Sequence, residues 1–112
     1  MLPKINRLRE EKDFDKIFKK GKNFKNSFLI LKVLQNNLKE NRFGFIISKK
    51  VSKKAVLRNK IKRRLRDIIH QNTKNIKKGI DVVLIVLPGL EEKNFLETKE
   101  ILNILLKKAD LI

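Results

Sequence analysis

A dense basic segment at residues 49–66 restricts what this chain can fold into and what it can bind. Its sequence, KKVSKKAVLRNKIKRRLR, holds ten lysines and arginines and no acidic residue. Like charges at this density repel one another, and a folded domain keeps them where a polyanion is the partner. The segment therefore predicts a surface that binds a nucleic acid or another polyanion.

Apolar residues recur through this segment and just beyond it. At roughly 100° per residue, they occupy one arc of a helix expected from about residue 55 to about residue 75. The members of this arc are Leu57, Ile61, Leu65, Ile68 and Ile69. Arg58 lies at the edge of the arc, where the stem of its side chain can follow the core. Solvated helix faces usually mix charges of both signs, so a face this uniformly basic favours binding over mere solvation.

Charge is distributed unevenly along the chain, whose formal net charge is +17. Residues 16–66 hold eighteen lysines and arginines and one acidic residue, Glu40, whereas the two signs nearly balance from residue 67 onward. We therefore expect the binding surface to lie in the first 66 residues. The length of 112 residues predicts one domain, residues 1–112.

Composition argues against several classes of protein. No apolar run approaches the roughly 20 residues that span a bilayer, and a membrane-surface protein needs apolar side chains that are free to insert. The opening residues, MLPKINRLREEKD, lack the apolar core of a signal peptide. The absence of cysteine excludes disulfides, a thiol nucleophile and a cysteine-based zinc site. We expect a cytoplasmic protein with no membrane partner.

The remaining pattern predicts helices and strands in the order α-β-β-β-α-β-α. After an extended lead-in at 1–9, the expected elements are a helix at 10–20, strands at 22–26, 28–35 and 42–48, the helix at 55–75, a strand at 80–87 and a helix ending near 108. We expect strands 28–35 and 42–48 to pair as an antiparallel hairpin. Strand 80–87, IDVVLIVL, is almost continuously apolar and should be central or covered by a helix.

Local signals refine these boundaries. Gly21 is the natural end of the first helix. Gly44, inside a strand, marks a bulge or the close approach of another part of the chain. Asn94 and Glu97 have the spacing of a capping box, which places the start of the last helix.

The basic segment also carries a specific motif. It reads Ser48-Lys49-Lys50-Val51, followed by Ala55-x-x-Arg58-Asn59-Lys60-Ile61-Lys62-Arg63. This motif resembles the Arg-Asn-Arg signature of the bacterial ribonuclease P protein subunit, and the resemblance extends over nearly the whole chain. Lys60 stands where the family usually has arginine, so the charge is kept but a bidentate fork to phosphate or guanine is lost.

The resemblance implies a fold and a function. The implied fold is an α/β (α+β) two-layer sandwich with a left-handed crossover between strands 42–48 and 80–87, where the general rule predicts a right-handed one. The implied function is that of a protein subunit of an endoribonuclease. In this family the RNA subunit holds the active site and most of the magnesium, and the protein assists removal of the 5′ leader from precursor tRNA.

The resemblance also implies two RNA-binding surfaces. Residues expected to contact the catalytic RNA, mainly through phosphates because the RNA major groove is narrow, are Lys49, Lys50, Lys53, Lys54, Arg58, Asn59, Lys60, Lys62, Arg63 and Arg66. Phe14 and Phe18 match aromatics that line the family's cleft for the single-stranded leader, although their spacing also suits ordinary core packing. Leu31 stands where many relatives carry an aromatic, so we include it in the leader site with weaker stacking.

No catalytic set is evident in the chain itself. His70 is the only histidine, and the acidic pairs Asp13 with Asp15 and Glu91 with Glu92 suit exposed positions better than metal sites. We expect no catalytic residue and no metal site in the protein, which disfavours a stand-alone nuclease. A small basic ribosomal-type protein or RNA chaperone is the alternative. A helix-based DNA-binding protein would usually be all-helical, so no DNA partner is expected.

Overall fold

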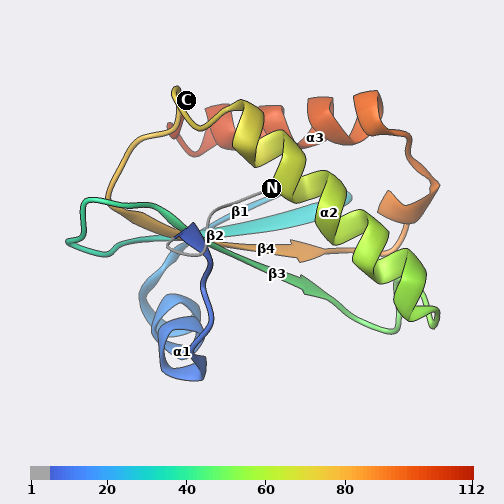
Figure 1. Ribbon diagram of the computed structural model, residues 1–112, viewed down its shortest axis with the longest axis horizontal. Coiled ribbons are helices and arrows are strands. Elements are labelled where there is room, and N and C mark those ends of the chain that lie inside the picture. The colour runs from blue at the N-terminus through green and yellow to red at the C-terminus, as the bar shows by residue number, and fades with distance from the viewer. Residues whose placement is uncertain (1–5) are drawn as a thin grey trace.

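The computed structural model describes residues 6–112, and its elements follow the predicted order. They are α1 (Glu11–Lys20), β1 (Lys22–Lys25), β2 (Leu29–Gln35), β3 (Arg42–Ile47), α2 (Ala55–Gln71), β4 (Ile80–Val86), a 3-10 turn η2 (Leu90–Glu92) and α3 (Phe95–Lys108) (Figure 1). Of the expected lead-in, residues 1–5 lie outside the described part of the chain. Arg7 is extended and forms an isolated parallel bridge with Phe43.

The strands form one sheet in the order β1-β2-β4-β3. Strand β4 lies between β2, with which it is antiparallel, and β3, with which it is parallel. The predicted hairpin between residues 28–35 and 42–48 is therefore wrong, because these two strands flank β4 instead of pairing. Every residue of β4 except Ile85 is buried, and a strand this apolar is stabilised most by a central position that has neighbours on both edges.

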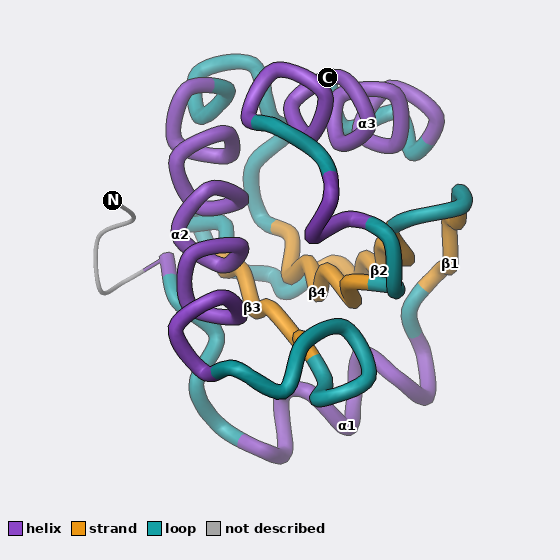
Figure 2. Tube along the Cα trace, turned by 90° about the vertical axis from the view of Figure 1, so that its right-hand side faces the viewer, coloured by secondary structure: helices purple, strands orange, loops and turns teal. Residues whose placement is uncertain are grey.

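Helix α2 connects β3 to its parallel neighbour β4. Figure 1 shows α2 on the same side of the sheet as α3. Figure 2 looks along β3 and β4 from their carboxyl ends, with α3 above the sheet, α2 on the left beside β3, and β4 to the right of β3. This arrangement is the left-handed crossover that the family resemblance implies. It is opposite to the hand that most parallel crossovers adopt.

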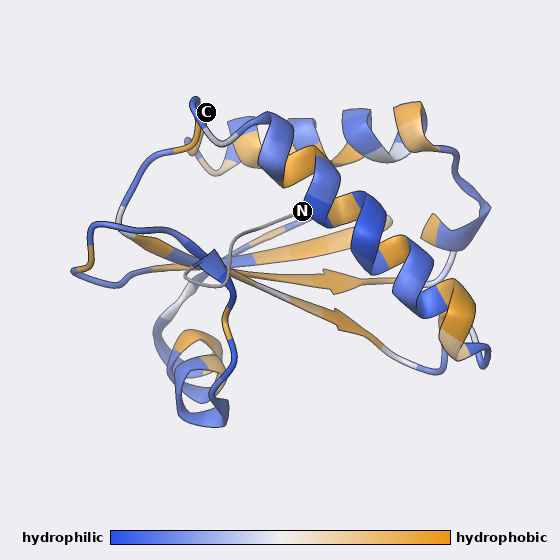
Figure 3. Cartoon of the chain, viewed as in Figure 1, coloured by the Kyte–Doolittle hydropathy of each residue, from blue (hydrophilic) through white to orange (hydrophobic). Residues whose placement is uncertain are grey.

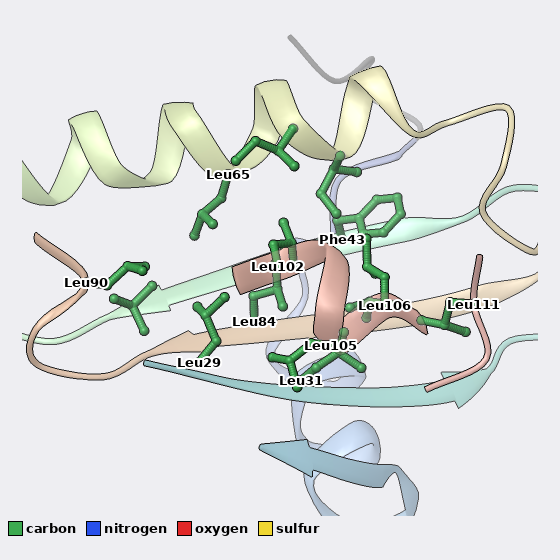
Figure 4. Packing of buried hydrophobic residues seen from close by; sticks show 14 of the residues in the cluster. Leu29, Leu31, Phe43, Leu65, Leu84, Leu90, Leu102, Leu105, Leu106 and Leu111 are labelled. Carbon is green, nitrogen blue, oxygen red and sulfur yellow. The ribbon is translucent and has the colours of Figure 1, made fainter. Parts of the chain in front are cut away.

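Helices α2 and α3 cover one face of the sheet and enclose the main core. Figure 3 shows largely hydrophobic strands beneath α2, along which hydrophilic and hydrophobic residues alternate. In the core, leucines of both helices meet leucines of β2 and β4 (Figure 4). The fully buried leucines of this core are Leu29, Leu31, Leu65, Leu84, Leu90, Leu102, Leu105 and Leu106. Burial of each such side chain stabilises the fold by about 1.5–3 kcal/mol before entropic costs.

The predicted apolar arc of α2 is buried except at its start. Ile61, Leu65, Ile68 and Ile69 are buried, but Leu57 is 40% exposed because the first turn of α2 extends past the ends of β3 and β4 (Figure 1). The helix also ends at Gln71, earlier than the predicted residue 75. The side chain and backbone N–H of the next residue, Asn72, both donate to the Ile68 carbonyl and so replace the missing turn.

The structure also tests the predicted capping box and the predicted roles of two glycines. The capping box of α3 is confirmed: the Asn94 side chain accepts from the Glu97 N–H at 2.8 Å, and the Glu97 carboxylate accepts from the Asn94 N–H at 3.1 Å. Gly21 ends α1 by donating its N–H to the Ile17 carbonyl at 2.8 Å, with an ordinary negative φ. Gly44 marks a close approach, because a Cβ at this position would lie 2.6 Å from the Phe14 ring.

Helix α1 lies on the opposite face of the sheet and covers only part of it (Figure 1). Ile17 is fully buried there against Val83 and Leu8, and Phe14 packs beside them. Ile46 and Ile85 belong to the same cluster but remain partly exposed. This face is therefore an incompletely covered sheet with an aromatic helix along one side.

Candidate nucleic-acid interface

The loop before α2 presents four exposed lysines, Lys49, Lys50, Lys53 and Lys54. Two serine hydroxyls shape this loop, because Ser48 accepts from the Lys50 N–H and Ser52 accepts from the Lys54 N–H, each at 3.2 Å. Arg58 is half-buried and donates from Nη1 to the Ser52 carbonyl at 2.9 Å. This predicted RNA contact therefore also joins the basic loop to the first turn of α2.

The exposed face of α2 carries the other predicted RNA contacts. Asn59, Lys60 and Arg63 are exposed, whereas Lys62 and Arg66 are half-buried. A hollow of about 390 Å³ runs along this face, lined by Asn59, Lys62, Arg63, Arg66 and Asp67. The helix thus offers a groove with four donors and one carboxylate, a suitable shape and charge for a phosphate backbone.

A second hollow, of about 270 Å³, joins α2 to the other side of the sheet edge. The residues around it are Arg7, Leu8, Arg9, Phe14, Phe43, Gly44, Phe45, Lys62 and Arg66. Four cationic side chains and three aromatic rings therefore surround one space, with no carboxylate among the lining residues. Phosphates and bases of single-stranded nucleic acid are bound by this combination of cations and aromatic faces.

Arg66 is half-buried and lines both hollows. Its guanidinium carbon lies 5.7 Å from the centre of the Phe45 ring, and its Nε atom is buried with no hydrogen-bond partner among the described residues. Burial lowers the pKa of Arg66, and the nearby positive charge of Arg7 lowers it further. An anion placed in this hollow would relieve both effects.

The three residues predicted for the leader site occupy different environments. Phe14 is half-buried beside Gly44, and Phe18 is 41% exposed, with the Lys32 ammonium 5.5 Å from its ring centre. Leu31 is fully buried in the core beneath α3, on the face of the sheet opposite α1. Its side chain reaches no surface, so the prediction that Leu31 contributes to an RNA-binding cleft is corrected. Alternation along β2 places its neighbour Lys32 on the α1 side instead.

Two cationic residues of the second hollow escaped the sequence prediction. Arg7 and Arg9 precede α1, in the segment that the sequence predicts as an extended lead-in. They reach the hollow because the extended lead-in runs along β3, with the Leu8 N–H donating to the Phe43 carbonyl at 2.8 Å. No sequence signal links residues 7–9 to α2, since the contact depends on tertiary structure alone.

The acidic residues and His70 form no obvious catalytic centre in the described part. No group of three or more His, Cys, Asp or Glu residues within 6–112 is arranged to hold a metal ion. Asp13 contacts Arg42 at 3.3 Å, and the Glu91 carboxylate accepts from the Gly89 N–H at 2.5 and 3.1 Å. His70 is exposed, and together with Thr73 it lines part of a hollow of about 160 Å³.

The described helices include none that is both long enough and apolar enough to cross a membrane. This result agrees with the composition of the chain, in which charged residues make up 37%.

Comparison with known proteins identifies relatives along almost the whole chain. The model of the family Ribonuclease P matches residues 2–110. A ribonuclease P protein component from Pseudanabaena is 40% identical, covering 100% of this chain and 97% of the relative. A mutant ribonuclease P protein from Staphylococcus aureus superposes with a TM-score of 0.92 at 30% identity, covering 97% of this chain and 92% of that one. The protein from Thermotoga maritima gives 0.80 at 36% identity, covering 88% and 94%.

Proposed function

This chain belongs to the ribonuclease P protein family, and on that premise we propose that it binds a catalytic RNA and the 5′ leader of precursor tRNA. Membership identifies it as a subunit of an endoribonuclease of tRNA processing. The observation that carries the finer proposal is the hollow that joins Phe14 to Lys62 and Arg66. This hollow shares Lys62 and Arg66 with the hollow along α2, so the two proposed surfaces adjoin each other there.

The outer face of α2 and its preceding loop are proposed to bind the RNA subunit. Support comes from the exposure of the four loop lysines together with Asn59, Lys60 and Arg63. These side chains project from a helix whose other face is fixed in the core by Leu65, Ile68 and Ile69. A rigid helix presents its charges without the entropic cost of ordering a flexible basic tail.

The α1 side of the sheet is proposed to bind the leader. Phe14 lines a hollow together with Lys62 and Arg66. Phe18, one turn further along α1, has the Lys32 ammonium beside its ring. Stacking of one base on an aromatic ring stabilises binding by about 1–3 kcal/mol and tolerates any base. Such a cleft suits an enzyme whose many precursor substrates differ in leader sequence.

Chemistry is proposed to reside in the RNA subunit. The described residues present cations, which stabilise phosphates, and lack a cluster of donors for magnesium. Magnesium prefers several oxygen ligands, including those of phosphates, so the RNA and its substrate are the better ligands. The role left to the protein is to bind, orient and neutralise.

Substitution of Phe14 tests the leader assignment. We expect Phe14→Ala to weaken binding of leader-bearing precursor about 5- to 150-fold, the range for one stacked base, while binding of mature tRNA stays unchanged. Both affinities are measured by filter binding to the complex assembled with a bacterial ribonuclease P RNA. Equal weakening of both substrates would assign Phe14 to the core alone. The matched control is Phe95→Ala, which removes a half-buried ring from α3.

A further inference from the structure

Arg42, the first residue of β3, joins two carboxylates from different parts of the fold. Its Nε and Nη2 atoms donate to the two carboxylate oxygens of Asp81 on β4, at 2.9 and 2.6 Å. Its Nη1 atom donates to Oδ2 of Asp13 on α1, at 3.3 Å. The hydrogen bond to Asp81 is the main cause of a raised pKa for Arg42, although burial opposes it.

The Asp81 carboxylate is held in a fixed position at one end of this bridge. Only 7% of its side chain is exposed, against 25% for Arg42 and 21% for Asp13. The Asn36 amide also donates to Asp81 Oδ1 at 2.8 Å. Bidentate arginine–carboxylate pairs fix direction as well as distance, so Arg42 presents its remaining Nη1 donor to α1 from a rigid position.

Within residues 6–112, helix α1 has few other directional attachments to the sheet. Its N-cap residue, Glu10, makes no side-chain capping bond, and the helix has ten residues, a length that is marginal by itself. Its buried contacts come from Ile17 and Phe14, and apolar contacts impose no fixed direction. The ion pair at Asp13 is therefore well placed to determine how the first turn of α1 sits over β3.

Asp13 directly precedes Phe14, whose ring lies against Gly44, two residues along β3 from Arg42. We propose that Arg42 is a positioning residue of the leader cleft, which bridges Asp81 and Asp13 so that the Phe14 ring stays over Gly44 beside Lys62 and Arg66. This inference rests on the proposed leader-binding function and identifies the group that sets its geometry.

The test changes Asp13, because changing Arg42 would leave the buried Asp81 carboxylate unpaired and could unfold the protein. Asp13→Asn keeps the Arg42–Asp81 pair and removes one negative charge from the first turn of α1. Glu11→Gln is the matched control, since Glu11 is an exposed acid in the same turn. Circular dichroism melting verifies that each variant is folded before binding is measured.

The measured quantity is leader preference, the ratio of the dissociation constants for mature and leader-bearing tRNA in the complex with the RNA subunit. We expect Asp13→Asn to reduce this preference about threefold to tenfold, a partial loss of one stacked base, and Glu11→Gln to change it less than about twofold. Affinity for the RNA subunit should be unchanged in both variants. In a Phe14→Ala background, Asp13→Asn should have no further effect, because the ring it positions is gone.

Two results would overturn the inference: equal effects of Asp13→Asn and Glu11→Gln, or an Asp13→Asn effect that persists undiminished in the Phe14→Ala background. Failure of the underlying function is visible separately. If Phe14→Ala alone leaves leader preference intact, the leader site itself is wrong and the positioning role falls with it. The inference is supported if Asp13→Asn lowers leader preference, Glu11→Gln does not, and the effect of Asp13→Asn requires Phe14.

Discussion

Neutralising two exposed charges on α2 should reduce the salt dependence of RNA binding by a calculable amount. Lys60 and Arg63 are both exposed and lie three residues apart on the outer face of the helix. The variant Lys60→Gln/Arg63→Gln keeps side chains of similar length and helix propensity. It therefore tests charge while leaving the buried face, including Ile61 and Leu65, unaltered.

The magnitude follows from counterion release. Each phosphate contact contributes about 0.7 to 0.9 to the slope of log affinity against log salt. If both residues contact phosphates, the slope becomes less steep by about 1.4 to 1.8. Between about 50 and about 200 mM salt, the wild-type protein should then lose about 7 to 12 times more affinity than the variant does.

The assay is titration of the RNA subunit at several salt concentrations with magnesium held constant. Lys107→Gln/Lys108→Gln serves as the control, because it removes the same charge from two exposed residues in the last turn of α3. The control should change the slope little, since α3 lies outside the proposed interface. Equal slopes for the two variants would refute the assignment of the α2 face and leave only a general effect of net charge.

Two further substitutions test the cleft and the fold. Gly44→Ala should displace the Phe14 ring, because the added Cβ would lie 2.6 Å from that ring. The variant should show a reduced leader preference and a free energy of unfolding lower by about 1–3 kcal/mol. Unchanged leader preference would show that the position of the ring does not matter for leader binding. Asn94→Ala removes the capping box of α3 and should lower the free energy of unfolding, measured by urea denaturation, by about 1 kcal/mol. The affinity for RNA, measured without urea, should stay unchanged. A change in RNA affinity would place α3 in the interface.

Local patterns in the sequence predicted the elements well because each depends on nearby residues. The spacing from Ile61 to Ile69 and the pair Asn94 and Glu97 fix helices through contacts within a few turns. Strand pairing is not local. The 28–35 and 42–48 segments were close in sequence, yet the apolar β4 separates them in the sheet, and only competition among all the strands decides that order.

The exposure of the candidate site residues was predictable where a sequence motif contained them, and less so where tertiary contacts bring distant residues together. The basic loop and the face of α2 were predicted from residues 49–66, and the structure shows those side chains exposed or half-buried. The position of Leu31 in the core could not be predicted, because the period of a strand gives two faces without saying which one is covered. The convergence of Arg7 and Arg9 with Lys62 and Arg66 arises from a lead-in that pairs with β3.

Cleavage of a precursor tRNA at low magnesium tests the central claim most directly. The comparison uses a bacterial ribonuclease P RNA alone, this protein alone, and the two together. The account predicts efficient cleavage at the mature 5′ end only when both are present, with chemistry on the RNA. Cleavage by the protein alone would contradict it and direct attention to His70, whereas no effect on a cognate RNA would leave a basic RNA-binding protein without this role.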